Sequence, residues 1–206
     1  MIDSFGPDAA LLVIDAQCGV DDLTHWGGDT GRRNNPNAED NLATLLRAWR
    51  DAGRRVMFTM HDSLEATSPL KLSLPTGQPK PGLQPRDDEE VIVKRVNGAF
   101  FGTDLDIRLR RTNTRRLIIG GFFTNMCVET TARTAGNLGY DTYLCADACA
   151  TTNRVGPDNT DHDPAIVHQM SIASIHGEFA TALATAHTVD LLDQPNLSMD
   201  RAQGNE

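Results

Sequence analysis

The sequence has 206 residues and a formal net charge of −9. This length suits one α/β domain with enough chain to bury a full core. The acidic balance argues against nucleic acid or an anionic membrane as the main partner. The N-terminal segment lacks the pattern of a signal peptide, and no apolar run reaches the length of a membrane span. We therefore expect a cytoplasmic protein whose four cysteines are reduced thiols.

Apolar runs alternate with helical patterns in the first half of the chain. Residues 9–15 are a continuous apolar run that Asp15 closes, and residues 56–60 form a second run. Such runs suit strands that are buried on both faces, as in a parallel sheet. Residues 18–37 are polar and glycine-rich, which predicts a loop. Residues 38–52 show a helical period in their large apolar side chains, which are Leu42, Leu45, Leu46 and Trp49.

The middle of the chain contains a proline-rich stretch, residues 63–90. It is too long and irregular for an ordinary connection, so we expect it to close a site, to form an interface or to be mobile. Residues 90–94 are predicted as a third strand with Lys94 at its end. Thr103 is predicted to cap the next helix, with Asp106 approximating a capping box. The inward-facing residues of that helix are expected to be Leu105 and Leu109.

The fourth strand is predicted over residues 117–121, where two glycines break an apolar, β-branched run. Thr124 or Asn125 would then offer a side-chain oxygen as the N-cap of a helix. Gly139 is the expected stop of that helix.

The last predicted elements are a fifth strand over residues 140–145, a long helix after a polar loop, and a short strand over residues 188–192. The core-facing residues of the long helix are predicted to be Ile166, Met170, Ala173, Ile175 and Phe179. Strands that alternate with amphipathic helices predict an α/β fold, a three-layer α-β-α arrangement around a six-stranded, mainly parallel sheet. We assign residues 1–192 to one domain and residues 193–206 to a polar C-terminal tail.

Cys127 is predicted to lie in the first turn of a helix, just after a buried strand. A helix N-terminus presents unpaired N–H groups and a positive dipole end, which favour a thiolate. The same N–H groups suit an oxyanion next to the attacking sulfur. The alternative is that Cys127 is a small buried hydrophobic residue, as most free cysteines are.

Two further polar residues end predicted strands. Asp15 follows the first strand, and Lys94 ends the third in a chain that has only three lysines and otherwise uses arginine. In open α/β sheets the ligand site lies at the carboxyl ends of the strands, so both residues could lie beside Cys127. A cation lowers the pKa of a thiol, and a carboxylate can carry its proton. Together the three residues indicate nucleophilic acyl transfer.

Three segments carry a more specific pattern: Leu-Val-Ile-Asp-Ala-Gln at 12–17, Val-Lys-Arg followed by Ala-Phe-Phe-Gly-Thr-Asp-Leu within 93–105, and Gly-Gly-Phe-Phe-Thr-Asn-Met-Cys-Val at 120–128. They resemble the isochorismatase-like cysteine hydrolases, a family that includes nicotinamidases, N-carbamoylsarcosine amidases, ureidoacrylate amidases and streptothricin hydrolases. The resemblance implies a Rossmann-like sheet of six parallel strands. It also implies a catalytic triad formed by Asp15, Lys94 and Cys127.

The resemblance implies a cis peptide between Phe122 and Phe123, which would aim the N–H groups of Phe123 and Cys127 into an oxyanion hole. In the implied reaction, Cys127 attacks an amide, ureido or lactam carbonyl and forms a thioester. Asp15 protonates the leaving amine and then activates the hydrolytic water. The substrate is expected to be a small amide or carbamoyl compound, and family members suggest a homodimer or a homotetramer.

The chain departs from two branches of the family. Nicotinamidases carry a metal-binding Asp-x-His with further histidines downstream, whereas this chain has Met60-His61-Asp62 and no histidine between His61 and His162. We therefore expect no metal and no cofactor. The isochorismatases proper cleave a vinyl ether and typically lack the cysteine, so Cys127 disfavours that branch.

Five more residues are candidates for the substrate pocket. Gln17 would orient a pocket water or cap the strand end, and the others would line the wall: Trp26, His61, Phe100 and Asn125. Rival readings are vinyl-ether hydrolysis, a non-catalytic family member, and a thiol-redox protein with Cys18 as the resolving cysteine. The intact triad pattern disfavours the non-catalytic reading.

Overall fold

The computed structural model describes residues 2–193 and contains the predicted sheet of six parallel strands. The strand order is β3-β2-β1-β4-β5-β8, and each neighbouring pair is parallel. The strands are β1 (Ala9–Ile14), β2 (Arg55–His61), β3 (Glu90–Lys94), β4 (Arg116–Phe122), β5 (Asp141–Ala150) and β8 (Thr181–Leu183). The order reverses between β1 and β4, which places the carboxyl ends of these two strands at a topological switch point.

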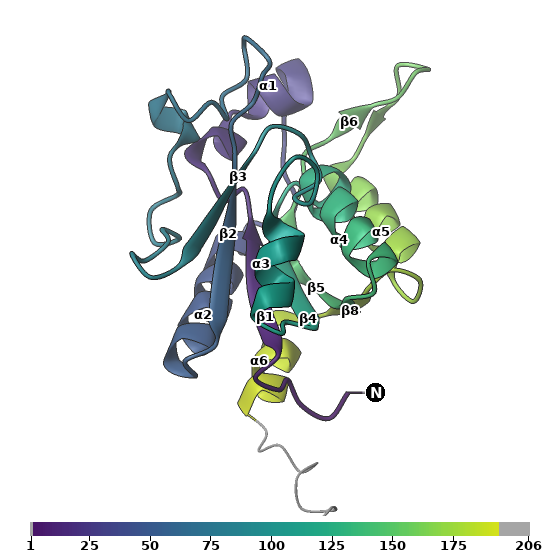
Figure 1. Ribbon diagram of the computed structural model, residues 1–206. Helices are drawn as coiled ribbons and strands as arrows, with labels where there is room; N and C mark the ends of the chain where they lie inside the picture. The colour runs from purple at the N-terminus through teal and green to yellow at the C-terminus, as the bar shows by residue number, and fades with distance from the viewer. Residues whose placement is uncertain (1, 194–206) are drawn as a thin grey trace, which may run out of the picture.

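Helices cover both faces of the sheet (Figure 1), so the predicted three-layer fold is confirmed. One core layer contains the apolar residues of α2 (Ala38–Asp51) and α6 (Thr185–Asp193). The opposite layer contains those of α3 (Leu105–Arg111), α4 (Glu129–Asn137) and α5 (Pro164–Ile175). As predicted, the buried positions of α2 include Leu42, Leu45, Leu46 and Trp49, and those of α3 are Leu105 and Leu109.

Strand β1 lies in the middle of the sheet, and this position explains why its sequence is continuously apolar. Leu11 and Val13 pack into the layer of α2, whereas Leu12 and Ile14 pack into the layer of α4. All six residues of the strand are buried, because both faces are covered by helices. This burial anchors the residue that follows the strand, Asp15, in a rigid position.

The predicted strand over residues 188–192 is wrong, because this segment belongs to helix α6. Thr188, Leu191 and Leu192 are buried at a spacing of three and four residues, which is the period of one helix face. That face packs against α2 and β5. The sixth strand is β8 instead, and residues 194–206 of the predicted tail lie outside the described residues.

The predicted inner face of helix α5 is right only toward its C-terminal end, where Ile175 is buried and Phe179, just beyond the helix, packs partly buried against the core. Ile166 and Met170 are 55% and 61% exposed, and Ala173 is exposed as well. The buried face holds Pro164, His168, Ser171 and Ile175. Two of these polar side chains hydrogen-bond to the segment that carries Cys127, and this polar contact outweighs apolar periodicity in orienting the helix.

The predicted caps need correction too. A single π-helical turn, η4 (Thr124–Val128), follows β4, and the residue before it, Phe123, makes no side-chain cap. Helix α3 begins one residue later than predicted, with Asp104 at the cap position, while Asp106 pairs with Arg110 at 3.0 Å. The predicted loop 18–37 contains three short helices: η1 (Cys18–Asp21), α1 (Leu23–Gly27) and η2 (Gly28–Thr30).

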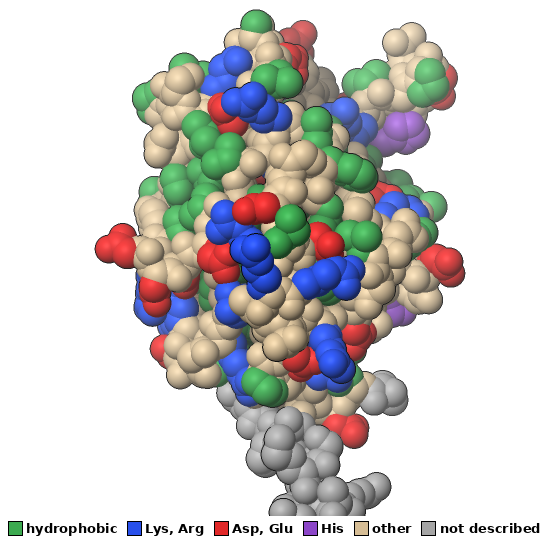
Figure 2. Space-filling model, in the orientation of Figure 1, with side chains coloured by type: hydrophobic (Ala, Val, Ile, Leu, Met, Phe, Trp, Pro, Cys, Tyr) green, Lys and Arg blue, Asp and Glu red, His purple; other side chains and the backbone are tan. Residues whose placement is uncertain are grey.

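The remaining elements are a short helix within the proline-rich stretch, η3 (Pro75–Gly77), and a separate two-stranded ribbon of β6 (Arg154–Val155) and β7 (Asp161–His162). On the face shown in Figure 2, basic and acidic side chains are interspersed. Within residues 2–193, no helix is both long and apolar enough to cross a membrane.

Candidate active site

The structure brings Asp15, Lys94 and Cys127 together at the carboxyl edge of the sheet. Lys94 Nζ lies 2.6 Å from Asp15 Oδ2 and 3.3 Å from Cys127 Sγ. Asp15 and Lys94 are each 1% exposed and Cys127 is 5% exposed. Three residues that are far apart in sequence therefore form one buried, charged cluster, at the place where the sheet topology predicts it.

The close approach of β1 and β4 depends on Gly121, just before the site. Its φ is +135°, and a Cβ at this position would lie 2.1 Å from the carbonyl oxygen of Ile14. Only glycine adopts this conformation without strain and leaves room for the neighbouring backbone. The second glycine of the predicted strand break thus sets the distance between the strands that carry Asp15 and Cys127.

Thr59 holds the Asp15 carboxylate in place. Its hydroxyl donates a hydrogen bond of 2.6 Å to Asp15 Oδ1 and accepts one of 3.1 Å from the Asp15 N–H. Sequence reasoning missed Thr59, because a threonine inside a strand is fully accounted for by its β propensity. The register that pairs Thr59 with Ile14 is the only signal that could have found it.

His61 lies within the same cluster. Its Nδ1 is 3.3 Å from Lys94 Nζ, 3.8 Å from Cys127 Sγ and 3.8 Å from Asp15 Oδ2. His61 is the last residue of strand β2, so its ring lies at the same edge of the sheet as the triad. The sequence predicted His61 in the pocket, and the structure places it against all three triad side chains.

Gln17 does not line the pocket; it fixes the backbone around His61. The His61 N–H donates to Gln17 Oε1 at 2.8 Å. Gln17 Nε2 donates to the carbonyl oxygens of His61, at 3.1 Å, and of Gly77, at 2.8 Å. The fully buried side chain thus ties the end of β2 to the proline-rich stretch.

The charges of the cluster define its resting protonation state. Burial alone raises the pKa of the Asp15 carboxyl, but Lys94 and His61 outweigh burial and lower this pKa to about 2. Burial lowers the pKa of Lys94, but the charge of Asp15 and the hydrogen bonds to Asp15 and Cys127 outweigh burial, so this pKa is raised. Asp15 is therefore a carboxylate and Lys94 an ammonium group at neutral pH.

The pKa of Cys127 shifts in the direction opposite to the one that a helix N-terminus and a nearby cation would produce. Burial and then the charge of Asp15 raise the pKa of the Cys127 thiol, and Lys94 opposes them only in part. The physical reason is that the positive charge of Lys94 is already balanced by Asp15. Cys127 therefore rests as a thiol, and its proton has to leave when it attacks.

A metal ion does not suit this cluster. Asp15, His61 and Cys127 offer side-chain atoms that lie within 4.8 Å of one another. The Lys94 ammonium lies among them, however, and repels a second cation. Asp62, next to His61, points elsewhere and accepts a hydrogen bond from the Leu72 N–H at 3.1 Å.

The turn that carries Cys127 is held from behind by helix α5. The Phe122–Phe123 peptide is cis, and η4 follows it directly. Thr124 Oγ1 lies 2.9 Å from His168 Nδ1, and the Ser171 hydroxyl lies 3.3 Å from the Thr124 carbonyl oxygen, to which it donates. The polar face of α5 therefore fixes the turn.

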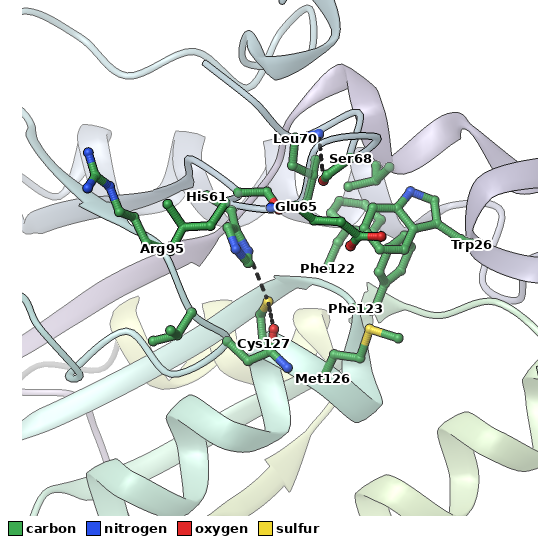
Figure 3. A pocket seen from close by; sticks show the side chains of 15 residues that line it. Trp26, His61, Glu65, Ser68, Leu70, Arg95, Phe122, Phe123, Met126 and Cys127 are labelled. Carbon is green, nitrogen blue, oxygen red and sulfur yellow. Dashed lines mark hydrogen bonds between the residues drawn. The ribbon is translucent and has the colours of Figure 1, made fainter. Parts of the chain in front are cut away.

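A cavity of about 260 Å³ opens in front of Cys127 (Figure 3). One wall is aromatic, with the rings of Trp26 and Phe123 packed edge to face at 5.0 Å. The proline-rich stretch supplies another part of the lining, which comprises Ser63, Leu64, Glu65, Ser68 and Leu70. That stretch therefore contributes to the wall of the site, one of the roles expected for it.

Two predicted pocket residues lie outside this cavity. Phe100 packs into the core and stacks on Tyr140 with ring centroids 5.9 Å apart. Asn125 accepts a hydrogen bond from the Thr151 hydroxyl. Both residues lie within the motif segments, but their side chains contact other parts of the protein and not the cavity.

Comparisons with known proteins agree with this geometry. The family model described as the isochorismatase domain matches residues 9–187. The uncharacterized isochorismatase family protein YrdC of Bacillus subtilis is 38% identical over 88% of this chain and 94% of its own. An isochorismatase-family structure from Chromobacterium violaceum superposes with a TM-score of 0.85 at 36% identity, over 91% of this chain and 95% of the other.

The fold and the cluster at the carboxyl ends of its strands define an α/β protein with a buried Asp-Lys-Cys site. The chain belongs to the isochorismatase family and is a hydrolase of that family. A shorter stretch, 37% of the chain, is 37% identical to 32% of the ureidoacrylate amidohydrolase RutB of Agrobacterium fabrum.

Proposed function

We propose that this protein hydrolyses a C–N bond in a small amide, ureido or lactam compound through a thioester on Cys127. The observation that carries the proposal is the position of the Cys127 sulfur. It faces a cavity on one side and the buried Asp15–Lys94 pair on the other. The partial similarity to an amidohydrolase supports the same class of reaction.

Acylation begins with the thiol proton. Asp15 Oδ2 lies in an ion pair with Lys94 but accepts no well-aligned hydrogen bond, so a lone pair is free for the proton of Cys127. The sulfur attacks the carbonyl carbon while Lys94 stabilises the developing thiolate. The N–H groups of Phe123 and Cys127 are proposed to receive the oxyanion. The C–N bond then breaks, and Asp15 returns its proton to the leaving amine.

The cavity favours a compact substrate without several acidic groups. Asp15 and Lys94 cancel each other, Glu65 adds a negative charge to the wall and Arg95 a positive one. We propose a small molecule with an apolar body against Trp26 and Phe123. We also retain the proposals of a homodimer or homotetramer and of a cytoplasmic location.

The test is a panel of amides and carbamoyl compounds with ammonia or amine detection. We expect at least one substrate whose turnover falls by about 10⁴-fold or more in Cys127→Ala. Cys18→Ala, which removes a partly buried thiol outside the cavity wall, is the matched control and should keep its activity. Amide hydrolysis that survives in Cys127→Ala would falsify the proposal.

The alternative functions predict different results for the same variants. A vinyl-ether substrate that is cleaved equally well by Cys127→Ala would support isochorismatase-type chemistry instead. Peroxide consumption that requires both Cys18 and Cys127 would support the redox reading. A complete lack of hydrolysis, with no acyl adduct on Cys127, would support a non-catalytic member.

A further inference from the structure

The two sides of Cys127 differ in which titratable groups they offer to water. Neither Asp15 nor Lys94 belongs to the cavity lining, and both side chains are almost fully buried. The titratable residues that the structure places on the cavity wall are His61, Glu65, Arg95 and Cys127. A hydrolytic water has to arrive from the cavity, so its base has to be found on this wall.

Two side chains on the wall meet the sulfur, the amide of Asn97, whose Oδ1 accepts from Sγ at 3.7 Å, and His61, which is the only titratable one of the two. Its Nδ1 lies 3.8 Å from Cys127 Sγ, and Figure 3 shows the ring directed at the sulfur. Glu65 and Arg95 are solvent-exposed, and Figure 3 shows the Arg95 guanidinium directed away from Cys127. An acyl carbon bonded to Sγ would therefore be adjacent to the imidazole.

We infer that His61 is the base that takes the proton of the hydrolytic water when the thioester is cleaved. This inference rests on the proposed function and adds a residue outside the Asp15–Lys94–Cys127 triad. It divides the proton transfers between two groups. Asp15 serves the thiol and the leaving amine on the buried side, and His61 serves the water on the cavity side.

The surroundings of the ring present a hydrogen-bond donor to Nδ1. The Lys94 ammonium, 3.3 Å away, can only donate, so Nδ1 has to present a lone pair to it. In the proposed deacylation step the ring acts as the neutral tautomer with its proton on Nε2. Gln17 holds the His61 backbone through two hydrogen bonds, which fixes the direction of the ring.

The contacts of Lys94 change as the thioester is cleaved, and this change frees His61 Nδ1 to accept a proton. Besides its ion pair with Asp15 Oδ2, the ammonium contacts three further groups: the Val96 carbonyl oxygen at 3.1 Å, Cys127 Sγ and His61 Nδ1. A thioester sulfur is a poor acceptor, but a departing thiolate is a strong one. As the C–S bond breaks, Lys94 turns toward the sulfur and leaves the Nδ1 lone pair to the water proton.

The step is balanced within the residues named. Water gives a proton to His61 Nδ1, and its oxygen bonds to the acyl carbon. The C–S bond breaks and its electron pair stays on Cys127 Sγ. The imidazolium then passes its proton to Sγ, which restores the thiol and the neutral ring and releases the acid product.

The test is His61→Gln, which keeps a polar side chain of similar reach but removes the base. With a substrate from the panel that carries a chromogenic amine, we expect a burst of about one equivalent of amine. A steady rate lowered by about 10²-fold or more should follow. Intact-mass spectrometry should show the acyl adduct on Cys127. Hydroxylamine, a nucleophile that needs less base assistance, should restore turnover.

His162→Gln, the same change at an exposed histidine on β7, is the matched control and should show neither burst nor adduct. A slow His61→Gln enzyme without burst or adduct would assign His61 to acylation and overturn the inference. Unchanged turnover would overturn it too. In both cases loss of activity in Cys127→Ala would still support the proposed function. If His61→Gln does not fold, His61→Asn provides the same readout.

Discussion

The two sides of the Cys127 sulfur are built in contrasting ways. The buried side consists of Asp15, Lys94 and Thr59, all on or directly after strands of the main sheet and all at most 1% exposed. The cavity side combines His61 from a strand end with Trp26 and Glu65, which come from segments between the strands. The first side is rigid and fully desolvated, and the second is assembled from connections.

This difference separates reactivity from specificity. A buried ion pair is held by mutual attraction, and losing one partner leaves an uncompensated charge, so the buried side does not tolerate the loss of either charge. Segments between strands vary without disturbing the core, so the cavity side can be adapted to another substrate. The same triad could therefore serve many substrates behind different walls.

Between the two sides of the sulfur, the largest effect is expected from Asp15→Asn on the buried side. The change leaves the Lys94 ammonium unpaired in the core, which should lower the free energy of unfolding by about 3–5 kcal/mol. Loss of the proton carrier should also reduce amide turnover by about 10³-fold. Urea denaturation and the substrate panel measure the two effects. Asp87→Asn, an exposed carboxylate of the proline-rich stretch, is the control that should change neither.

The pH dependence of stability sharpens the same point. The pKa of Asp15 is lowered to about 2 in the folded protein, below its value in the unfolded chain. Its stabilisation is therefore complete above about pH 4 and is lost as the pH falls toward 2, a change of about 2 kcal/mol. Urea midpoints across this range should bring wild type closer to Asp15→Asn. If the difference between the urea midpoints of wild type and Asp15→Asn stayed constant with pH, Asp15 would not be a carboxylate in the folded protein.

The buried side was largely predictable from the sequence. Asp15 and Lys94 end apolar runs, and Lys94 is one of only three lysines. Strand ends meet at one edge of a parallel sheet, so their convergence with Cys127 follows from topology alone. Thr59 was not predictable, because its role depends on a hydrogen bond across the register between β1 and β2.

The cavity side was harder to predict, because side-chain direction in connecting segments depends on tertiary contacts. Trp26 and His61 line the cavity, but Phe100 turns into the core and Asn125 pairs with Thr151. Gln17 hydrogen-bonds to backbone instead of reaching the pocket. In each case the residue type fits both outcomes.

A similar limit applies to the helices. Residues 188–192 contain β-branched residues that suit a strand, yet packing against α2 makes them a helix. Ile166 and Met170 of α5 follow an apolar period and still face outward, because His168 and Ser171 bind the turn that carries Cys127. A prediction based on hydrophobic pattern alone therefore fails where polar contacts that support a site orient the helix.

Thr59→Val tests whether the buried side needs its hydroxyl. Valine keeps the shape of threonine but removes the 2.6 Å hydrogen bond to the Asp15 carboxylate. A hydrogen bond to a charged group contributes about 1.5–3 kcal/mol, so we expect turnover to fall by at least about tenfold. Thr59→Ser retains the hydroxyl and should keep most of the activity. Equal losses in the two variants would point to packing instead of the hydrogen bond.

The smallest effect is expected on the cavity side, from Trp26→Ala. The indole packs edge to face on Phe123 and donates a hydrogen bond of 2.8 Å to the Gly19 carbonyl oxygen. Both contacts are with residues outside the triad. Losing an aromatic contact with substrate costs about 0.5–1.5 kcal/mol, so KM should rise about threefold to tenfold while kcat changes little. Trp26→Phe, which keeps an aromatic face, should show a smaller rise. If kcat fell and KM stayed constant, the wall would act on the chemical step, and the separation of reactivity from specificity would not hold.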